Sequence, residues 1–241
     1  MTVTTAMIDD LMLRSQEIVR RLANDLALNS YVDAELPLPR PFIGRGEIQL
    51  VIIGQDPTVE NEASRKKIAT ALMLDGNGPL PRFLSSVCAK LGFSLENVYA
   101  TNVCKNFFKQ TPTQIKEARR IDVIGLSHRQ WMPLLQEELA WFPNAAIISL
   151  GQPSLRCLVR PGFSHDVKSY WGYRQGWSKQ GFDPFRPVIA EQSVIDRTFF
   201  PFVHLNTNRK SRSGAFYKIR LNDYFDFIRD QIRKEANACQ S

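Results

Sequence analysis

The sequence lacks the features that would place a protein in a membrane or outside the cell. No apolar run among its 241 residues approaches the roughly 18 residues that a membrane-spanning helix needs. The first ten residues contain no basic region followed by an apolar core, so we expect no secretory signal there. We therefore expect a cytoplasmic protein with no membrane partner.

Clustered metal ligands and nucleotide-binding glycine motifs are also missing. Zinc and iron–sulfur sites need clustered thiolates, but the four cysteines are far apart and form no CxxC pair: Cys88, Cys104, Cys157 and Cys239. We predict reduced structural thiols and no metal, although clustering in space stays open. Neither GxGxxG nor GxxxxGK[ST] occurs, so an unrelated α/β enzyme acting on nucleotides has no support.

Acidic residues are absent from one basic stretch. The chain carries a net charge of +7, and residues 204–220 contain six basic side chains and no Asp or Glu. Basic proteins with clustered positive charge favour polyanionic partners such as nucleic acid.

The pattern of apolar residues predicts a single α/β domain over residues 1–241, with residues 1–35 as an N-terminal helical extension. Four short apolar runs predict strands at 48–53, 97–101, 145–150 and 199–203. Amphipathic segments predict helices at 7–28, 82–91, 113–142 (one or two helices), 152–159 and 214–233. This alternation favours three α/β/α layers around a mostly parallel four-stranded sheet. Residues 36–46 are expected to be an extended connector, and the aromatic-rich stretch 160–198 a long functional loop or insertion.

Three polar residues follow three of the predicted strands: Asp56, Asn102 and His204. If those strands are parallel, their carboxyl ends meet at one edge of the sheet, where α/β proteins bind ligands. Each residue alone has an ordinary explanation as a turn or structural residue. Their coincidence, next to a basic segment, favours an active site.

At these positions the chain resembles the uracil-DNA glycosylase superfamily. Gly54-Gln55-Asp56-Pro57 matches the start of the family's water-activating motif GQDPY, and Tyr99-Ala100-Thr101-Asn102 stands where the family's base-reading Asn ends a strand. Residues 203–211 stand where the family has HPSPLS, in a degenerate form. The resemblance covers roughly residues 45–235.

The resemblance implies a monofunctional DNA glycosylase that uses no metal or cofactor. Asp56 would stabilise the sugar cation and position a water, and His204 would donate a hydrogen bond to the pyrimidine O2. Asn102 would read the N3/O4 edge of a flipped base, and Gln55 would shape the pocket through its backbone. The partner would be single- or double-stranded DNA, bound by a monomer.

Two departures from the family pattern concern the base pocket. The family's uracil enzymes have a Tyr after GQDP that blocks a substituent at C5, and this chain has Thr58. The family's stacking Phe falls on Leu74 or its neighbour Met73. A pocket open at C5 suits a bulky modified pyrimidine, such as the hydroxymethylated or glucosylated bases of phage DNA, and would point to antiviral defence. Plain uracil excision in DNA repair is the alternative.

The HPSPLS-like segment offers Arg209, Lys210, Ser211 and Arg212 for DNA binding. Lys210 and Arg212 are expected at phosphates, and Ser211 is a further candidate for a phosphate contact. Arg209 could touch a phosphate or fill the gap that the flipped base leaves. Because this third motif is degenerate, a non-catalytic DNA-binding module stays a competing reading.

Overall fold

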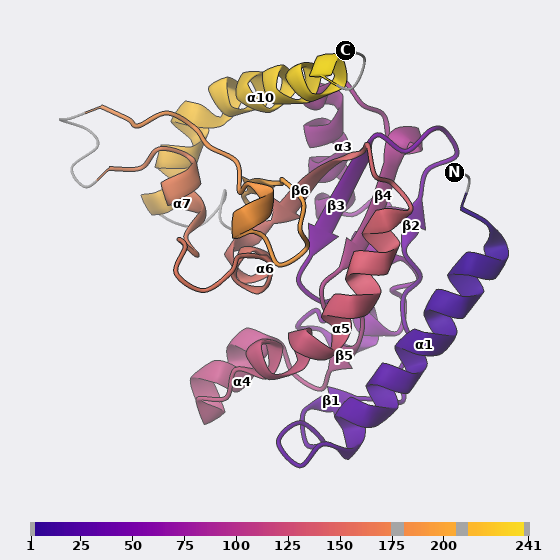
Figure 1. Cartoon of the computed structure of the whole chain (residues 1–241). Coiled ribbons are helices and arrows are strands. Elements are labelled where there is room, and N and C mark those ends of the chain that lie inside the picture. The colour runs from indigo at the N-terminus through magenta and orange to yellow at the C-terminus, as the bar shows by residue number, and fades with distance from the viewer. Residues whose placement is uncertain (1–2, 175–180, 206–211, 239–241) are drawn as a thin grey trace.

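The computed structural model describes residues 3–174, 181–205 and 212–238. Its centre is a five-stranded sheet in the order β2-β4-β3-β6-β7. The strands are β2 (Phe42–Ile43), β3 (Leu50–Gly54), β4 (Val98–Asn102), β6 (Ala146–Leu150) and β7 (Phe200–Phe202). Strands β4, β3, β6 and β7 are parallel, as expected from the sequence, and β2 is antiparallel to β4. Helices cover both faces (Figure 1), which confirms the α/β/α class.

The fifth strand is a difference from the sequence-based expectation. Phe42 and Ile43 pair with Ala100 and Tyr99, within the segment expected to be only an extended connector. A second, two-stranded sheet joins β1 (Val32–Asp33) to β5 (Phe107–Phe108). Two-residue strands carry too few side chains to show an alternating pattern in sequence.

The three central strands are wholly buried because helices pack on both faces of the sheet. Strands covered on both sides are expected to be continuously apolar, and Leu50 to Ile53 are all 0% exposed. Because β3, β4, β6 and β7 are parallel, all four strands start at one edge of the sheet, and their carboxyl ends meet at the opposite edge.

Local signals in the sequence set the helix ends. The Thr4 side chain accepts a hydrogen bond from Met7 N at the start of α1 (Thr5–Asn24). Pro79 begins α3 (Pro79–Leu91), and Gly92 ends it in the left-handed conformation (φ 89°) that glycine adopts most readily. The remaining helices are α2 (Glu62–Arg65), α4 (Pro112–Arg119), α5 (Val123–Ala140), α6 (Gly151–Leu158), α7 (Val167–Tyr170) and α10 (Arg212–Ala238), with 3-10 turns η1 (Ala71–Met73), η2 (Leu95–Asn97) and η3 (Ala190–Gln192).

Two aromatic residues of the 160–198 stretch pack inward, whereas Phe163 and Phe182 are exposed. Tyr170 and Trp171 are 2% and 0% exposed, and Trp171 Nε1 donates a hydrogen bond to Pro201 O (2.8 Å) in β7. Tyr224 of α10 donates to the same carbonyl oxygen (2.8 Å). These side chains join the stretch to β7 and α10 as part of the core. Trp177 lies outside the described residues.

Two kinds of feature are absent from the described residues. Within the described ranges, no helix is both long enough and apolar enough to cross a membrane. The same part of the chain holds no cluster of three or more His, Cys, Asp or Glu side chains suited to a metal ion.

Candidate active site at the carboxyl edge of the sheet

The structure brings the strand-end residues to one edge of the sheet, as the parallel order predicts. Asn102 is the last residue of β4 and pairs in register with Gly54, the last residue of β3. Asp56 lies in the loop directly after Gly54, and His204 lies just beyond the end of β7. Asp56 and Asn102 therefore belong to neighbouring strands, with His204 on the other side of β6.

Asp56 is a half-buried carboxylate held by the loop that contains it. Thr58 N donates a hydrogen bond to Asp56 Oδ2 (2.9 Å), which closes a tight turn. Burial raises the pKa of the Asp56 carboxyl to about 6, and hydrogen bonds from Thr58 and the charge of Arg65 oppose that rise. The carboxyl is therefore mostly ionised at neutral pH and protonated below about pH 6.

Asn102 presents an acceptor with an unmet hydrogen-bonding capacity. Its side chain is 2% exposed, and Oδ1 has no hydrogen-bond partner among the residues that the structure describes. A buried polar atom without a partner destabilises a fold by about 1–3 kcal/mol. Such an atom at a strand end is expected where a ligand supplies the missing donor.

Gly54 is required by the position of Asn102. A Cβ at Gly54 would lie 2.3 Å from Asn102 Oδ1 and 2.6 Å from Leu72 Cδ2. The missing side chain thus lets the amide of Asn102 pack directly over the end of β3. Gln55 adds a hydrogen bond just beyond the paired ends of β3 and β4, because its carbonyl oxygen accepts from Cys104 N (2.9 Å).

His204 is anchored over a second glycine. A Cβ at Gly151, the first residue of α6, would lie 3.2 Å from His204 Cβ. Gly151 has a φ of +83°, in the left-handed region that side chains disfavour. Burial lowers the pKa of His204 below its usual value, so the imidazole is neutral at neutral pH and can donate one hydrogen bond.

Leu72, which sequence reasoning missed, is an apolar side chain that reaches the end of β3. It lies within van der Waals reach of the Gly54 position, whereas Leu74 is 4% exposed and belongs to the core cluster. Leu72 and Met73 both have a φ of 56°, which is unusual outside glycine. Strained residues of this kind concentrate at functional sites, and no apolar periodicity could have marked them.

Of the remaining predicted residues, Thr58 has contacts that the structure describes. Thr58 Oγ1 accepts a hydrogen bond from Phe108 N (2.8 Å) in β5, so its hydroxyl is committed to the neighbouring strand. Arg209, Lys210 and Ser211 lie outside the described residues, and the side chain of Arg212 does too. Their expected DNA contacts stay predictions.

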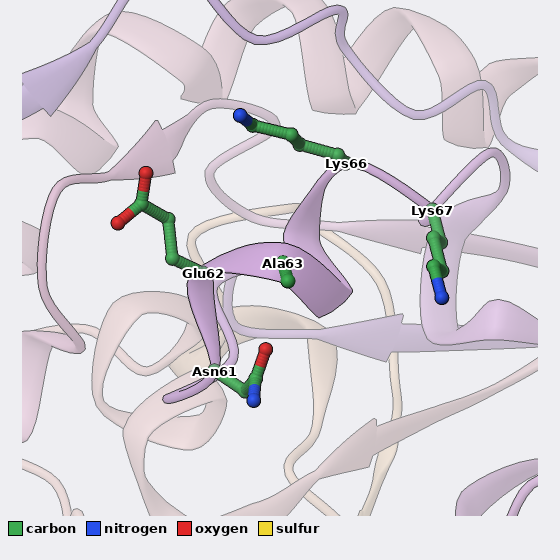
Figure 2. A pocket seen from close by; sticks show the side chains of 5 residues that line it. All are labelled: Asn61, Glu62, Ala63, Lys66 and Lys67. Carbon is green, nitrogen blue, oxygen red and sulfur yellow. The ribbon is translucent and has the colours of Figure 1, made fainter.

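A surface depression lies beside this edge and not over it. Asn61, Glu62, Ala63, Lys66 and Lys67, on and around α2, line it (Figure 2). None of the strand-end residues takes part.

The comparisons with known proteins agree with the geometry of this edge. No curated protein is detectably similar to the chain in sequence. The sequence model of the Uracil DNA glycosylase superfamily matches residues 41–225, a span that includes Asp56, Asn102 and His204. Because the match covers more than half of the chain, the protein belongs to the uracil-DNA glycosylase superfamily.

Proposed function

We propose that the protein is a monofunctional DNA glycosylase that hydrolyses the N-glycosidic bond of a flipped-out pyrimidine. Membership of the superfamily supports glycosylase-type hydrolysis on DNA. The observation that carries the proposal is the buried, unpartnered Oδ1 of Asn102 at the same sheet edge as Asp56. A pyrimidine edge would supply the missing donor, from N3–H of uracil or from the amino group of a cytosine-type base.

The chemistry assigns a role to each residue. When the C1′–N1 bond breaks, the base leaves with the bonding electron pair and the sugar becomes a cation. The ionised Asp56 carboxylate stabilises that cation and orients the water that adds to C1′, and the proton that this water loses balances the one that the departing base anion takes up. Neutral His204 donates its hydrogen bond to O2 of the departing base, where negative charge develops. No step in this sequence needs a metal or a cofactor.

The experiment that tests this function is base release from a panel of synthetic DNAs. Each DNA would carry uracil, thymine, cytosine, 5-hydroxymethylcytosine or a glucosylated form, in single and double strands, and alkaline cleavage would report abasic sites. We expect release of at least one base, a loss of most release in Asp56→Asn with DNA binding kept, and a loss of about 100- to 1000-fold in His204→Ala. DNA binding without any release would instead indicate a non-catalytic module.

The preferred base is the finer part of the proposal. Thr58 stands where the resemblance places a C5-blocking Tyr, and its hydroxyl is turned to Phe108 N. A small residue fixed in that orientation favours a pocket that is open at C5 and hence a bulky C5-modified pyrimidine as the substrate. An enzyme that defends against modified foreign DNA would need such a pocket. Plain uracil excision is the second candidate, supported by the intact GQDP motif.

Thr58→Tyr separates the two candidates. If the C5 side is open, the added ring should abolish release of C5-modified bases and spare release of uracil. Equal losses on both bases would contradict the open pocket. Thr58→Val is the matched control, because it keeps the size of the side chain and removes only the hydroxyl that accepts from Phe108 N.

A further inference from the structure

Arg65 is a buried cation in a segment that is otherwise on the surface. It ends the short helix α2 and is 4% exposed, whereas its neighbours Lys66 and Lys67 are exposed and extend away from the helix (Figure 2). An arginine is almost never fully buried unless its donors are satisfied.

The guanidinium joins the loop that follows Asp56 to the end of β5. Arg65 Nε donates to Val59 O (2.7 Å) and Nη2 to Glu60 O (3.4 Å), both in the loop. Nη1 donates to Phe108 O (3.1 Å) and Lys109 O (2.7 Å), at the end of β5. Four main-chain carbonyl oxygens from two separate segments thus converge on one side chain.

Thr58 makes a second link between the same two segments. Its Oγ1 accepts from Phe108 N (2.8 Å), so Phe108 is held through its N–H by Thr58 and through its carbonyl by Arg65. The backbone N–H of Thr58 in turn donates to Asp56 Oδ2 (2.9 Å). A continuous path of hydrogen bonds therefore runs from Arg65 through β5 and Thr58 to the carboxylate.

The charge of Arg65 acts on Asp56 as well as its geometry. Burial, the largest effect, raises the pKa of Asp56, and the guanidinium charge counteracts it. Among the described residues, the thiols of Cys104 and Cys157 also interact with Asp56. Burial raises the pKa of both thiols, so they are neutral and cannot replace the arginine.

We propose that Arg65 is a positioning residue that holds Asp56 in place and in its charged form. The assignment rests on the proposed role of Asp56 in base release. It extends that role, because the pH below which base release falls would then depend on a residue outside the GQDP motif.

The test compares Arg65→Gln, which loses the charge, with Arg65→Lys. The lysine keeps the charge but lacks the planar guanidinium that donates to four carbonyl oxygens. Single-turnover release of the best base of the DNA panel would be followed from pH 5 to pH 9. For Arg65→Gln we expect the acid limb to move up by about one pH unit, the low end for loss of a neighbouring opposite charge. Release at pH 6 then falls about fivefold and recovers at pH 9. Arg65→Lys should keep the wild-type midpoint and slow the plateau.

A direct titration of Asp56 makes the result independent of turnover. Carbon-13 NMR of the labelled carboxyl should show the same upward shift in Arg65→Gln, whether or not any base is released. Silence of the wild-type enzyme on the panel would overturn the proposed function, and an unchanged Asp56 titration in Arg65→Gln would overturn the role of Arg65.

Arg197 supplies the matched control. It also clamps main-chain carbonyls, with Nη1 donating to Leu139 O and Phe142 O (both 3.0 Å) and Nη2 to Ala145 O (2.5 Å), between α5 and β6. Arg197→Gln should leave the acid limb in place. If it moved the limb as far as Arg65→Gln, or if Arg65→Lys moved it as far as Arg65→Gln, the specific role of Arg65 would be wrong.

Discussion

A single methyl group at Gly54 would collide with the side chain that we expect to read the base. The Cβ of an alanine would lie 2.3 Å from Asn102 Oδ1, so Asn102 must shift. We predict that Gly54→Ala destabilises the fold by about 1–3 kcal/mol, as overpacking does. We also expect base release to fall about 10- to 100-fold, through loss of one hydrogen bond to the base. Chemical denaturation and single-turnover kinetics would measure the two effects.

Gly76→Ala is the control for that substitution. A Cβ at Gly76 would meet only Met73 O, at 3.4 Å, which is ordinary contact. It should leave release unchanged. Wild-type kinetics in Gly54→Ala would show that Asn102 is not the reading residue.

At this scale the sequence was informative about residues that end strands and silent about those that act through loops. Asp56, Asn102 and His204 could be placed together because apolar runs precede them and parallel strands share an edge. Arg65 and Leu72 could not. Arg65 lies in a polar stretch that resembles surface, and Leu72 owes its place to an unusual backbone angle that no side-chain pattern encodes.

Helix α5 and the segment that follows β4 are joined by a buried ion pair. Lys105 Nζ contacts Glu138 Oε2 and donates to Asn102 O (3.3 Å), and Glu138 is 0% exposed. Tyr99 Oη (2.5 Å) and Thr101 Oγ1 (3.0 Å) both donate to Glu138 Oε1. We predict that Glu138→Gln lowers the free energy of unfolding by about 3–5 kcal/mol, because it leaves Lys105 buried without its counter-charge.

The neighbouring residue on α5 is a control for that prediction. Glu137 pairs with Arg14 at the surface, and an exposed pair contributes less than about 1 kcal/mol. Glu137→Gln should therefore hardly move the urea midpoint, and adding Lys105→Met to Glu138→Gln should recover part of the loss. Equal midpoints for Glu137→Gln and Glu138→Gln would show that the buried pair carries no special weight.

Helices and strands differ in how far the sequence determines their limits. The helix expected at 7–28 ends at Asn24, because Asp25 leaves the helical conformation. The stretch 113–142 divides into α4 and α5, where Arg120 adopts a left-handed φ of 59° and Asp122 caps the second helix. Short β2 escaped prediction because edge pairing with β4, a long-range contact, creates it.

The whole molecule is positively charged, and its affinity for DNA should follow from that charge. With a net charge of +7 and a basic stretch after β7, binding should weaken steeply as salt rises. We predict that Lys210→Ala and Arg212→Ala each reduce the slope of log affinity against log salt by about one, as loss of one phosphate contact does.

Those slopes would be measured in an Asp56→Asn background, so that the DNA stays intact. Lys234→Ala, an exposed substitution far along α10, is the control and should leave the slope unchanged. If all three variants kept the wild-type slope, the stretch after β7 would not contact phosphates.

The half-buried carboxylate of Asp56 should also affect the thermal stability of the protein. The pKa of Asp56 rises from 3.8 to about 6 on folding, so the folded state binds the proton more tightly than the unfolded chain. Its contribution to stability is therefore full below pH 3.8 and is lost as the pH rises through about 6. At pH 8 the loss amounts to at most about 3 kcal/mol.

Asp56→Asn should consequently melt several degrees higher than the wild type at pH 8 and show no gain at pH 4, a contrast that calorimetry can measure. Equal melting temperatures of Asp56→Asn and the wild type at pH 8 would contradict the raised pKa of Asp56. A search for heat-resistant variants without an activity screen would thus favour loss of this carboxylate. If Asp56 acts in base release as proposed, thermal stability and base excision would therefore favour different residues at position 56.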